Sequence, residues 1–169
     1  MERLYLLLCL GYTQSSKWIS LFQEAEGVTM SETTSPRPKP LPVITDENRP
    51  FWEGCRQGKL LLQHCDQCQH YQFYPRLYCM HCGSTTLHWS EVSGRGVIYS
   101  FTIIHQNKSP EFVNDTPYNL AIVQLEEGPR MLSNVVDIDP ADLRVELPVT
   151  VVFDAVTDTI SLPRFRPDR

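Results

Sequence analysis

The pattern of apolar and polar residues changes about halfway along the chain. After residue 88, short segments of alternating or β-branched residues are separated by turn-forming Gly, Pro, Asn and Asp. Such segments are typical of β-strands. Strands are predicted at residues 97–104, 118–125, 130–136, 149–153 and 159–162. The second half of the chain is therefore expected to be an all-β domain.

The connections between these strands indicate how they are arranged. Gly94-Arg-Gly96 is expected to break or bulge the chain after a further strand at 87–92. Residues 126–129 form a hairpin turn, and residues 139–143 supply one helical turn. A long bent first strand, a hairpin, a helical turn and a closing hairpin favour a five-stranded OB-fold barrel, with a β-sandwich as the alternative.

Residues 45–58 carry the signals of a short helix. Thr45 or Asp46 is a candidate N-cap, acidic residues are expected in the first turn, and Gly58 is expected to end the helix. Pro50 is compatible only with a position near the start.

One face of this helix is apolar. Phe51 and Cys55 share it because they are four residues apart, and Trp52 lies beside them. The aromatic side chains either pack on the rest of the domain or dock a partner protein.

Two Cys-x-x-Cys pairs with ten residues between them predict a metal site formed by Cys65, Cys68, Cys79 and Cys82. A short strand at 60–63 leads into the first pair. The aromatic-rich segment 69–78 between the pairs is predicted to be a small hairpin, as in a rubredoxin-like zinc ribbon. Disulfides or a redox pair are the other interpretations, but a redox pair is expected to open a helix of a βαβ unit, which this sequence lacks.

Zinc is the expected metal and iron the alternative, because thiolates accept both ions. A closed shell of thiolates indicates a structural ion rather than a catalytic one. His64, His70 and His81 lie near the pairs and could each replace a thiolate, but they are expected on the surface. Thiolates that hold a metal indicate a reducing compartment, so a cytoplasmic location is predicted.

The chain is expected to divide into an N-terminal extension, a helix with a zinc ribbon, and an OB-fold barrel. These three regions are residues 1–44, 45–88 and 89–167. Within the extension, residues 1–29 are predicted to be disordered or mis-annotated, with translation starting at Met30. Residues 31–44 are a Pro-rich linker, which favours an extended conformation.

Charge and motifs exclude several classes of function. Residues 1–88 carry eight Lys or Arg and eight Asp or Glu, whereas residues 89–169 carry seven and twelve. This acidic half argues against a nucleic-acid surface, which is normally basic.

The apolar run Leu4–Leu10 is too short to span a bilayer. No phosphate loop, dinucleotide motif or Gly-x-Ser-x-Gly is present, and the helix face favours burial of Cys55 over catalysis.

A series of short motifs resembles one known family. The motifs are Phe51-Trp-Glu-Gly54, Gly58-Lys-Leu60, the two cysteine pairs, Tyr74-Pro-Arg76, Cys82-Gly-Ser84, Trp89, Val92-Ser-Gly94-x-Gly96, Tyr99-Ser-Phe-Thr102, Pro117-Tyr118, Gly128-Pro-Arg130 and Leu162-Pro-Arg-Phe165. Over about residues 42–167 they resemble the zinc-ribbon/OB-fold family of acyl-CoA-associated accessory proteins, long described as a domain of unknown function. Glu146 stands where that family usually has Gly, which concerns one turn and not the fold.

The resemblance implies a non-catalytic accessory subunit of a thiolase-superfamily complex that acts on acyl-CoA in lipid or steroid metabolism. The partner would be a thiolase, a lipid-transfer-type aldolase, a hydroxymethylglutaryl-CoA synthase or an acyl-CoA hydratase-like protein. The accessory subunit would supply a scaffold and part of the CoA and substrate channel. The alternatives are a single-stranded nucleic-acid-binding OB-fold protein and an acyl-CoA enzyme in its own right.

Seven side chains are candidates for these roles. Three cations are expected to bind CoA phosphates, namely Arg95, Lys108 and Arg130. The other interpretation is that each is an exposed charge that keeps the protein soluble. Residues expected to dock the partner are Phe51, Trp52, Tyr74 and Arg76.

Overall fold

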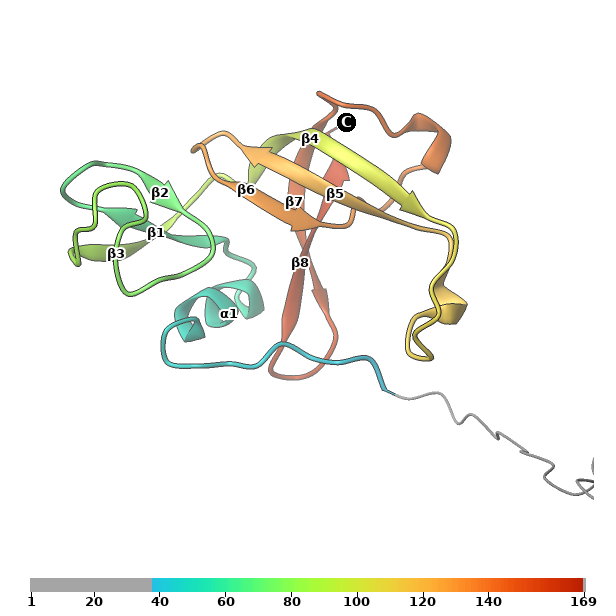
Figure 1. Cartoon of the computed structure of the whole chain (residues 1–169), viewed down its shortest axis with the longest axis horizontal. Helices are drawn as coiled ribbons and strands as arrows, with labels where there is room; N and C mark the ends of the chain where they lie inside the picture. The colour runs from blue at the N-terminus through green and yellow to red at the C-terminus, as the bar shows by residue number, and fades with distance from the viewer. Residues whose placement is uncertain (1–37, 169) are drawn as a thin grey trace, which may run out of the picture. The chain divides into compact units, whose positions relative to one another are not determined.

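A computed structural model describes residues 38–168, so the predicted start at Met30 and most of the predicted extension lie outside the described residues. The described chain has one α-helix, α1 (Arg49–Arg56), and two antiparallel sheets (Figure 1). The smaller sheet contains β1 (Leu61–Cys65), β2 (Tyr71–Gln72) and β3 (Leu87–Glu91). The larger sheet contains β4 (Arg95–Ile104), β5 (Tyr118–Leu125), β6 (Arg130–Ser133), β7 (Pro148–Ala155) and β8 (Ser161–Pro167). Within residues 38–168, no helix is long and apolar enough to cross a membrane.

The helix starts later than the sequence predicts. Asn48 occupies the N-cap position, but its side chain makes no capping bond and instead accepts a hydrogen bond from the Thr45 N–H at 2.8 Å. Thr45 and Asp46 therefore precede the helix, and its first turn contains no acidic residue, so both predictions were wrong. The predicted end is confirmed, because Gly58 adopts a φ of 75°, which a glycine reaches without steric cost.

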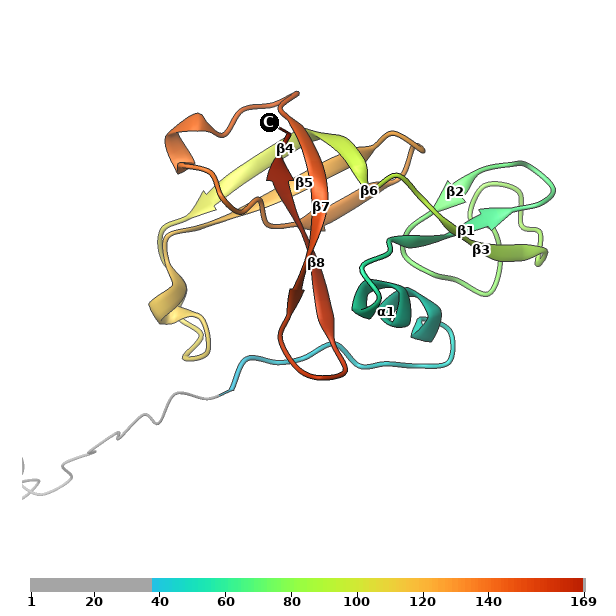
Figure 2. The ribbon, with the colours of Figure 1, turned by 180° about the vertical axis from the view of Figure 1, so that it is seen from behind.

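The smaller sheet has the strand order β2-β1-β3, with β1 in the centre. The predicted hairpin within 69–78 is wrong, because β2 pairs with β1 across the first Cys-x-x-Cys turn rather than with its own neighbours. The strand predicted at 87–92 also belongs here: β3 pairs with β1 from Leu61 opposite Glu91 to Cys65 opposite Leu87. Figure 2 shows these strands from behind, beside α1.

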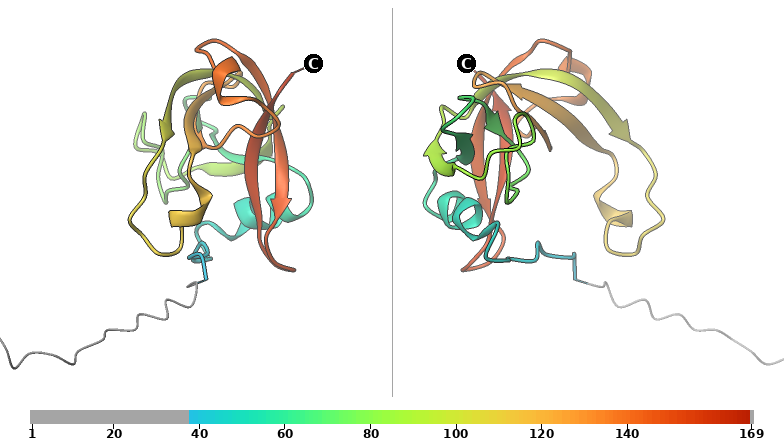
Figure 3. Two further views of the ribbon diagram at one scale, coloured as in Figure 1. Left: turned by 90° about the vertical axis from the view of Figure 1, so that its right-hand side faces the viewer. Right: turned by 60° about the vertical axis from the view of Figure 1, so that its left-hand side comes forward.

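The larger sheet has the order β6-β5-β4-β7-β8 and curls into the half-barrel of an OB-fold, as Figure 3 shows from two sides. A short 3₁₀ turn, η1 (Val113–Asp115), lies between β4 and β5, and the predicted helical turn between the third and fourth strands is present as η2 (Pro140–Asp142). A parallel bridge from Val135 to Phe165 joins the segment after β6 to β8. The predicted break at Gly94-Arg-Gly96 is confirmed, because β3 ends at Glu91, Gly94 has a φ of 69° and β4 begins at Arg95. A further irregularity, which was not predicted, lies inside β4 between Ile98 and Ser100.

A single apolar core connects the two sheets. It contains Phe51 and Cys55 from α1, Leu62 from β1, and residues of the larger sheet such as Val123 and Phe165. Phe165 and Cys55 are fully buried. Helix α1 contacts β1, β7 and β8, so the apolar face predicted from its sequence holds the small sheet against the barrel.

Candidate metal centre and adjoining groove

The four cysteines of the two Cys-x-x-Cys pairs come together at one end of the smaller sheet. Their sulfur atoms all lie within 4.8 Å of one another. The Sγ atoms of Cys65 and Cys82 are 3.6 Å apart, and those of Cys68 and Cys79 are 3.5 Å apart. None of the cysteines in the described part of the chain forms a disulfide. Four sulfurs at these separations form the shell that a tetrahedral ion requires, so this donor set fits a metal.

Backbone N–H groups in the turns around the cysteine pairs favour the thiolate form of some of the sulfurs. The backbone N–H of Cys68 lowers the pKa of Cys65, and the N–H of Cys82 lowers the pKa of Cys79 to about 6. Desolvation instead raises the pKa of Cys68 to about 12. Backbone dipoles thus favour thiolate at some positions, but four negative sulfurs in one place need a cation to neutralise them.

Cys55, the other cysteine considered, is remote from this chemistry. It is fully buried in α1, and desolvation raises its pKa to about 12. A thiol in such surroundings is a poor nucleophile. The structure therefore gives a physical reason for the packing role that the sequence favours.

A groove of about 420 Å³ is lined by all four residues that were predicted to dock a partner. These are Phe51, Trp52, Tyr74 and Arg76. Its walls come from the segment before α1, from α1 itself and from the loop after β2. The opposite wall comes from β6 and β8. Phe51 and Phe73 pack with their ring centroids 5.4 Å apart, and Phe73 stacks on Tyr74 at 4.2 Å. Tyr74 keeps 58 % of its surface exposed, so one end of this aromatic series is open to solvent.

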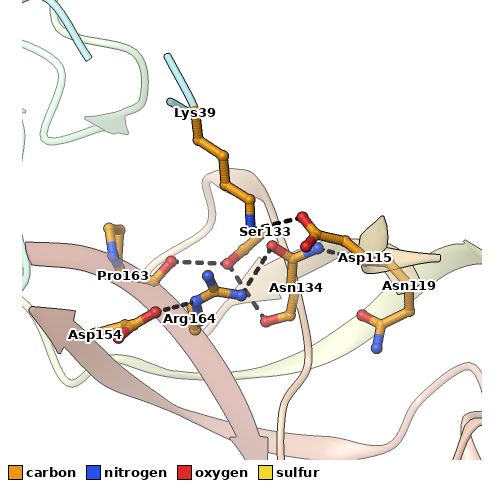
Figure 4. A network of polar contacts seen from close by, with 8 residues as sticks. All are labelled: Lys39, Asp115, Asn119, Ser133, Asn134, Asp154, Pro163 and Arg164. Carbon is orange, nitrogen blue, oxygen red and sulfur yellow. Dashed lines mark hydrogen bonds and ion pairs between the residues drawn. The ribbon is translucent and has the colours of Figure 1, made fainter. Parts of the chain in front are cut away.

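The barrel side of the groove carries a network of polar contacts among apolar residues such as Met131 and Leu162, which the sequence did not reveal (Figure 4). Ser133 donates a hydrogen bond to the Pro163 carbonyl at 2.8 Å. Arg164 pairs through Nε with Asp154 at 2.9 Å and donates from Nη1 to the Asn134 side chain at 3.4 Å. Pro163 and Arg164 belong to the Leu162-Pro-Arg-Phe165 motif, but nothing in that motif indicates a partner on β6. They meet Ser133 because the curl of the larger sheet brings its two edge strands, β6 and β8, into contact.

The cations predicted to meet CoA phosphates do not form one cluster. Arg95 starts β4 and pairs with Glu126 at 3.2 Å, while the Arg130 guanidinium lies 3.5 Å from the centre of the Tyr99 ring. Lys108 lies in the β4–β5 loop, beyond the other end of the ten-residue β4. At about 3.3 Å per residue, the two ends of β4 lie up to roughly 30 Å apart, with Arg95 at one end and the loop of Lys108 at the other.

Family models match two adjacent stretches of the chain. They are the rubredoxin-like zinc ribbon domain of ChsH2, over residues 52–88, and the C-terminal OB-fold domain of ChsH2, over residues 89–154. The boundary between the two models falls within β3.

Three known proteins illustrate the relationship. A probable enoyl-CoA hydratase alpha subunit of Thermomonospora curvata is 34 % identical over 140 residues, which are 81 % of this chain and 43 % of that protein. A DUF35 domain-containing scaffold protein of Pyrococcus furiosus is 32 % identical over 102 residues, 60 % of this chain and 74 % of that protein. The solved Ltp2-ChsH2(DUF35) aldolase matches with a TM-score of 0.68 and 33 % identity, over 75 % of this chain and 98 % of the matched chain.

These matches agree with the observed order of zinc ribbon and OB-fold. The chain spans less than half the length of the hydratase subunit, but nearly the whole length of the matched chain in the aldolase structure. This chain belongs to the DUF35 family and has the ribbon and OB-fold arrangement of ChsH2.

Proposed function

We propose that this chain is a non-catalytic, zinc-binding accessory subunit of a thiolase-superfamily complex that acts on acyl-CoA. The observation that carries the proposal is the similarity, over 98 % of the matched chain, to a solved structure described as an Ltp2-ChsH2(DUF35) aldolase. Relatives described as a DUF35 scaffold protein and as an enoyl-CoA hydratase alpha subunit support the same assignment.

The four-cysteine site serves this role as a structural zinc centre. Zinc suits a tetrahedral site of four sulfurs, and the absence of an open position leaves the ion no substrate to activate. Because such a site does not exist in the unfolded chain, the free energy of metal binding stabilises the fold. The ion thereby keeps the loops that carry Tyr74 and Arg76 in place.

The groove beside α1 is the proposed contact with a thiolase-like or hydratase-like subunit. Aromatic residues and Arg are the residue types that most often dominate binding energy at protein interfaces. Here Trp52, Tyr74 and Arg76 line one groove. Further apolar surface continues along the loop after β2, where Leu77 is 75 % exposed and Met80 is 64 % exposed. An exposed apolar patch beside a groove is typical of an interaction surface.

The barrel is the proposed wall of the CoA channel. Arg95 and Arg130 lie at the same end of the larger sheet, since both are close to the turn between β5 and β6. Guanidinium groups bind phosphate in a bidentate fashion, so this end is the proposed place for the CoA phosphates. Lys108 would contribute a positive charge to the binding of CoA phosphates from a separate place, the β4–β5 loop.

Co-purification tests the assembly. Tagged chain is co-expressed with candidate thiolase-like, aldolase-like and hydratase-like subunits, starting with those encoded beside its own gene. Tyr74→Ala should weaken capture of the partner at least about tenfold, because a central aromatic anchor is commonly worth 2 kcal/mol or more. Tyr78→Ala is the matched control: Tyr78 is 51 % exposed in the same loop but does not line the groove.

The same preparation separates this proposal from its alternatives. The complex should turn over acyl-CoA, whereas the isolated chain should not. Failure to bind any thiolase-superfamily or hydratase-like subunit would contradict the proposed function. Turnover by the isolated chain would favour an enzyme, and strong salt-sensitive binding of single-stranded DNA would favour a nucleic-acid-binding protein.

A further inference from the structure

A row of aromatic side chains crosses the smaller sheet beside the cysteine site. His64 in β1 lies directly opposite Tyr71 in β2 and directly opposite His88 in β3. Residues directly opposite each other in antiparallel strands project from the same face of the sheet. The ring centroids confirm the contact, at 4.5 Å from His64 to Tyr71 and 5.0 Å from His64 to His88.

Asp66 brings a carboxylate to this pair of histidines. It follows β1 directly, and its Oδ1 atom lies 2.7 Å from Nδ1 of His88. One ligand atom from each of His64, Asp66 and His88 lies within 4.8 Å of the other two. Two imidazoles and one carboxylate form a donor set that zinc and other first-row transition ions accept.

The cluster is both reachable and incompletely satisfied. The side chains of His88 and Asp66 are 50 % and 56 % exposed, so an ion can approach from solvent. By contrast, Nδ1 of His64 is buried and has no hydrogen-bond partner among the described residues. A buried polar atom without a partner costs roughly 1–3 kcal/mol, and an ion bound by that nitrogen would remove this cost.

The cluster is separate from the four cysteines. His64 and Cys65 are consecutive in β1, and consecutive residues of a strand project from opposite faces. The Cys65 thiolate and the His64 imidazole therefore lie on opposite faces of the sheet. One ion cannot draw ligands from both.

We infer that His64, Asp66 and His88 form a second, exchangeable site for a divalent transition-metal ion such as zinc. Ligand atoms on one tetrahedral zinc ion lie about 3.4 Å apart, given bonds of about 2.0–2.2 Å. The contact between Oδ1 of Asp66 and Nδ1 of His88, at 2.7 Å, must therefore lengthen when an ion binds, so this site is weaker than the cysteine site. With three protein ligands, it leaves one position for water or for a ligand from another molecule.

Metal counting on the full chain, without any partner, tests this inference independently of the proposed function. The protein is first loaded with one zinc and dialysed, and further zinc is added in a calorimetric titration. A second equivalent should bind and should be removed again by a mild chelator, while the first is retained. A single equivalent at every zinc concentration, with no heat from a second, would overturn the inference.

Variants identify the ligands. His88→Ala should weaken the second site at least tenfold, since loss even of an outer-sphere partner commonly costs about 10–100-fold in metal affinity. Asp66→Asn should also lower the affinity of the second site for zinc, and this substitution changes the shape of the side chain least. His105→Ala is the matched control, because His105 is also exposed but follows β4 in the larger sheet.

Retention of the first zinc shows that each variant is folded. Nitrogen NMR of the imidazoles should show shifts at His64 and His88 on addition of the second equivalent. A second equivalent that survives His88→Ala and Asp66→Asn unchanged, or that shifts only His105, would refute the assignment.

Discussion

Asn119 allows a sharp test of how the half-barrel is closed. Its side chain donates a hydrogen bond from Nδ2 to the Val135 carbonyl at 2.7 Å and accepts one at Oδ1 from the Val135 N–H at 2.7 Å. It thereby satisfies both backbone groups of a residue that is only 3 % exposed. Val135 also bridges to Phe165, so Asn119 anchors the segment that joins β6 to β8. The Asn119 carbonyl in turn accepts a hydrogen bond from Asn134 (Figure 4).

Replacing Asn119 with Ala should therefore cost more than two ordinary hydrogen bonds. Each bond contributes a net of about 1 kcal/mol, but a buried backbone group left without a partner costs about 1–3 kcal/mol. Water that enters the space offsets part of this, so the expected loss in the free energy of unfolding is about 2–4 kcal/mol. With a urea m-value of about 2 kcal/mol/M, the unfolding midpoint should fall by about 1–2 M.

Urea unfolding of the zinc-loaded chain, followed by tryptophan fluorescence, measures this loss. Asn107→Ala is the matched control, because Asn107 also makes two hydrogen bonds, to Tyr118 and to the Ser109 N–H, each at 2.9 Å. The Ser109 bond is exposed, so water can replace it, and the expected loss is below about 1 kcal/mol. An equal loss for both variants would show that closure of the barrel does not depend on Asn119.

Three further predictions concern other parts of the chain. Gly96→Ala should destabilise the fold by more than about 2 kcal/mol in the same urea assay, because a Cβ there would lie 2.3 Å from the Gln124 carbonyl oxygen; Thr102→Ala, at an exposed position of the same strand, is the control, and equal effects would refute the reasoning. Cys55 should resist iodoacetamide in the native protein at pH 8, because burial raises its pKa to about 12; mass spectrometry that finds rapid labelling would contradict this. Acid should release zinc, because protons compete with the ion for the thiolates; without the ion the pKa of Cys79 is lowered to about 6, below the unfolded value of about 8.5, so its thiolate stabilises the metal-free fold at neutral pH and this contribution is lost as the pH falls through about 6. A zinc-binding dye should detect this release, and full retention at pH 4 would contradict it.

Local sequence determined much of this protein. The strand at 118–125 is found with the predicted bounds, because its apolar and β-branched run is flanked by Pro117 and by the turn at 126–129. The spacing of the two cysteine pairs led directly to the four-sulfur cluster, since each Cys-x-x-Cys turn brings two sulfurs together by itself. Apolar residues four apart also predicted the buried face of α1, with Phe51 and Cys55.

The errors fall where the partner of a segment, rather than its own residues, decides the outcome. Residues 69–78 were expected to pair with themselves, yet Tyr71–Gln72 pairs with β1, because the turn of the first cysteine pair already brings these strands together. The helix was assigned a conventional cap, but Asn48 bonds back to Thr45 instead. The irregularity inside β4, between Ile98 and Ser100, was not predicted, because it depends on the register of β4 with β5.

Only the tertiary structure revealed the polar wall of the groove and the histidine cluster. The polar wall of the groove joins Ser133 on β6 to Arg164 on β8, although these residues are far apart in sequence. The cluster of His64, Asp66 and His88 needs β1 and β3 in one particular register, because a shift by one residue would turn His88 to the other face. Sequence periodicity reports which side of its own element a residue occupies, but not which distant element meets that side. The chain therefore reveals its metal ribbon through local spacing, its histidine cluster only through the pairing of β1 with β3, and the polar wall of its groove only through the curl of the larger sheet.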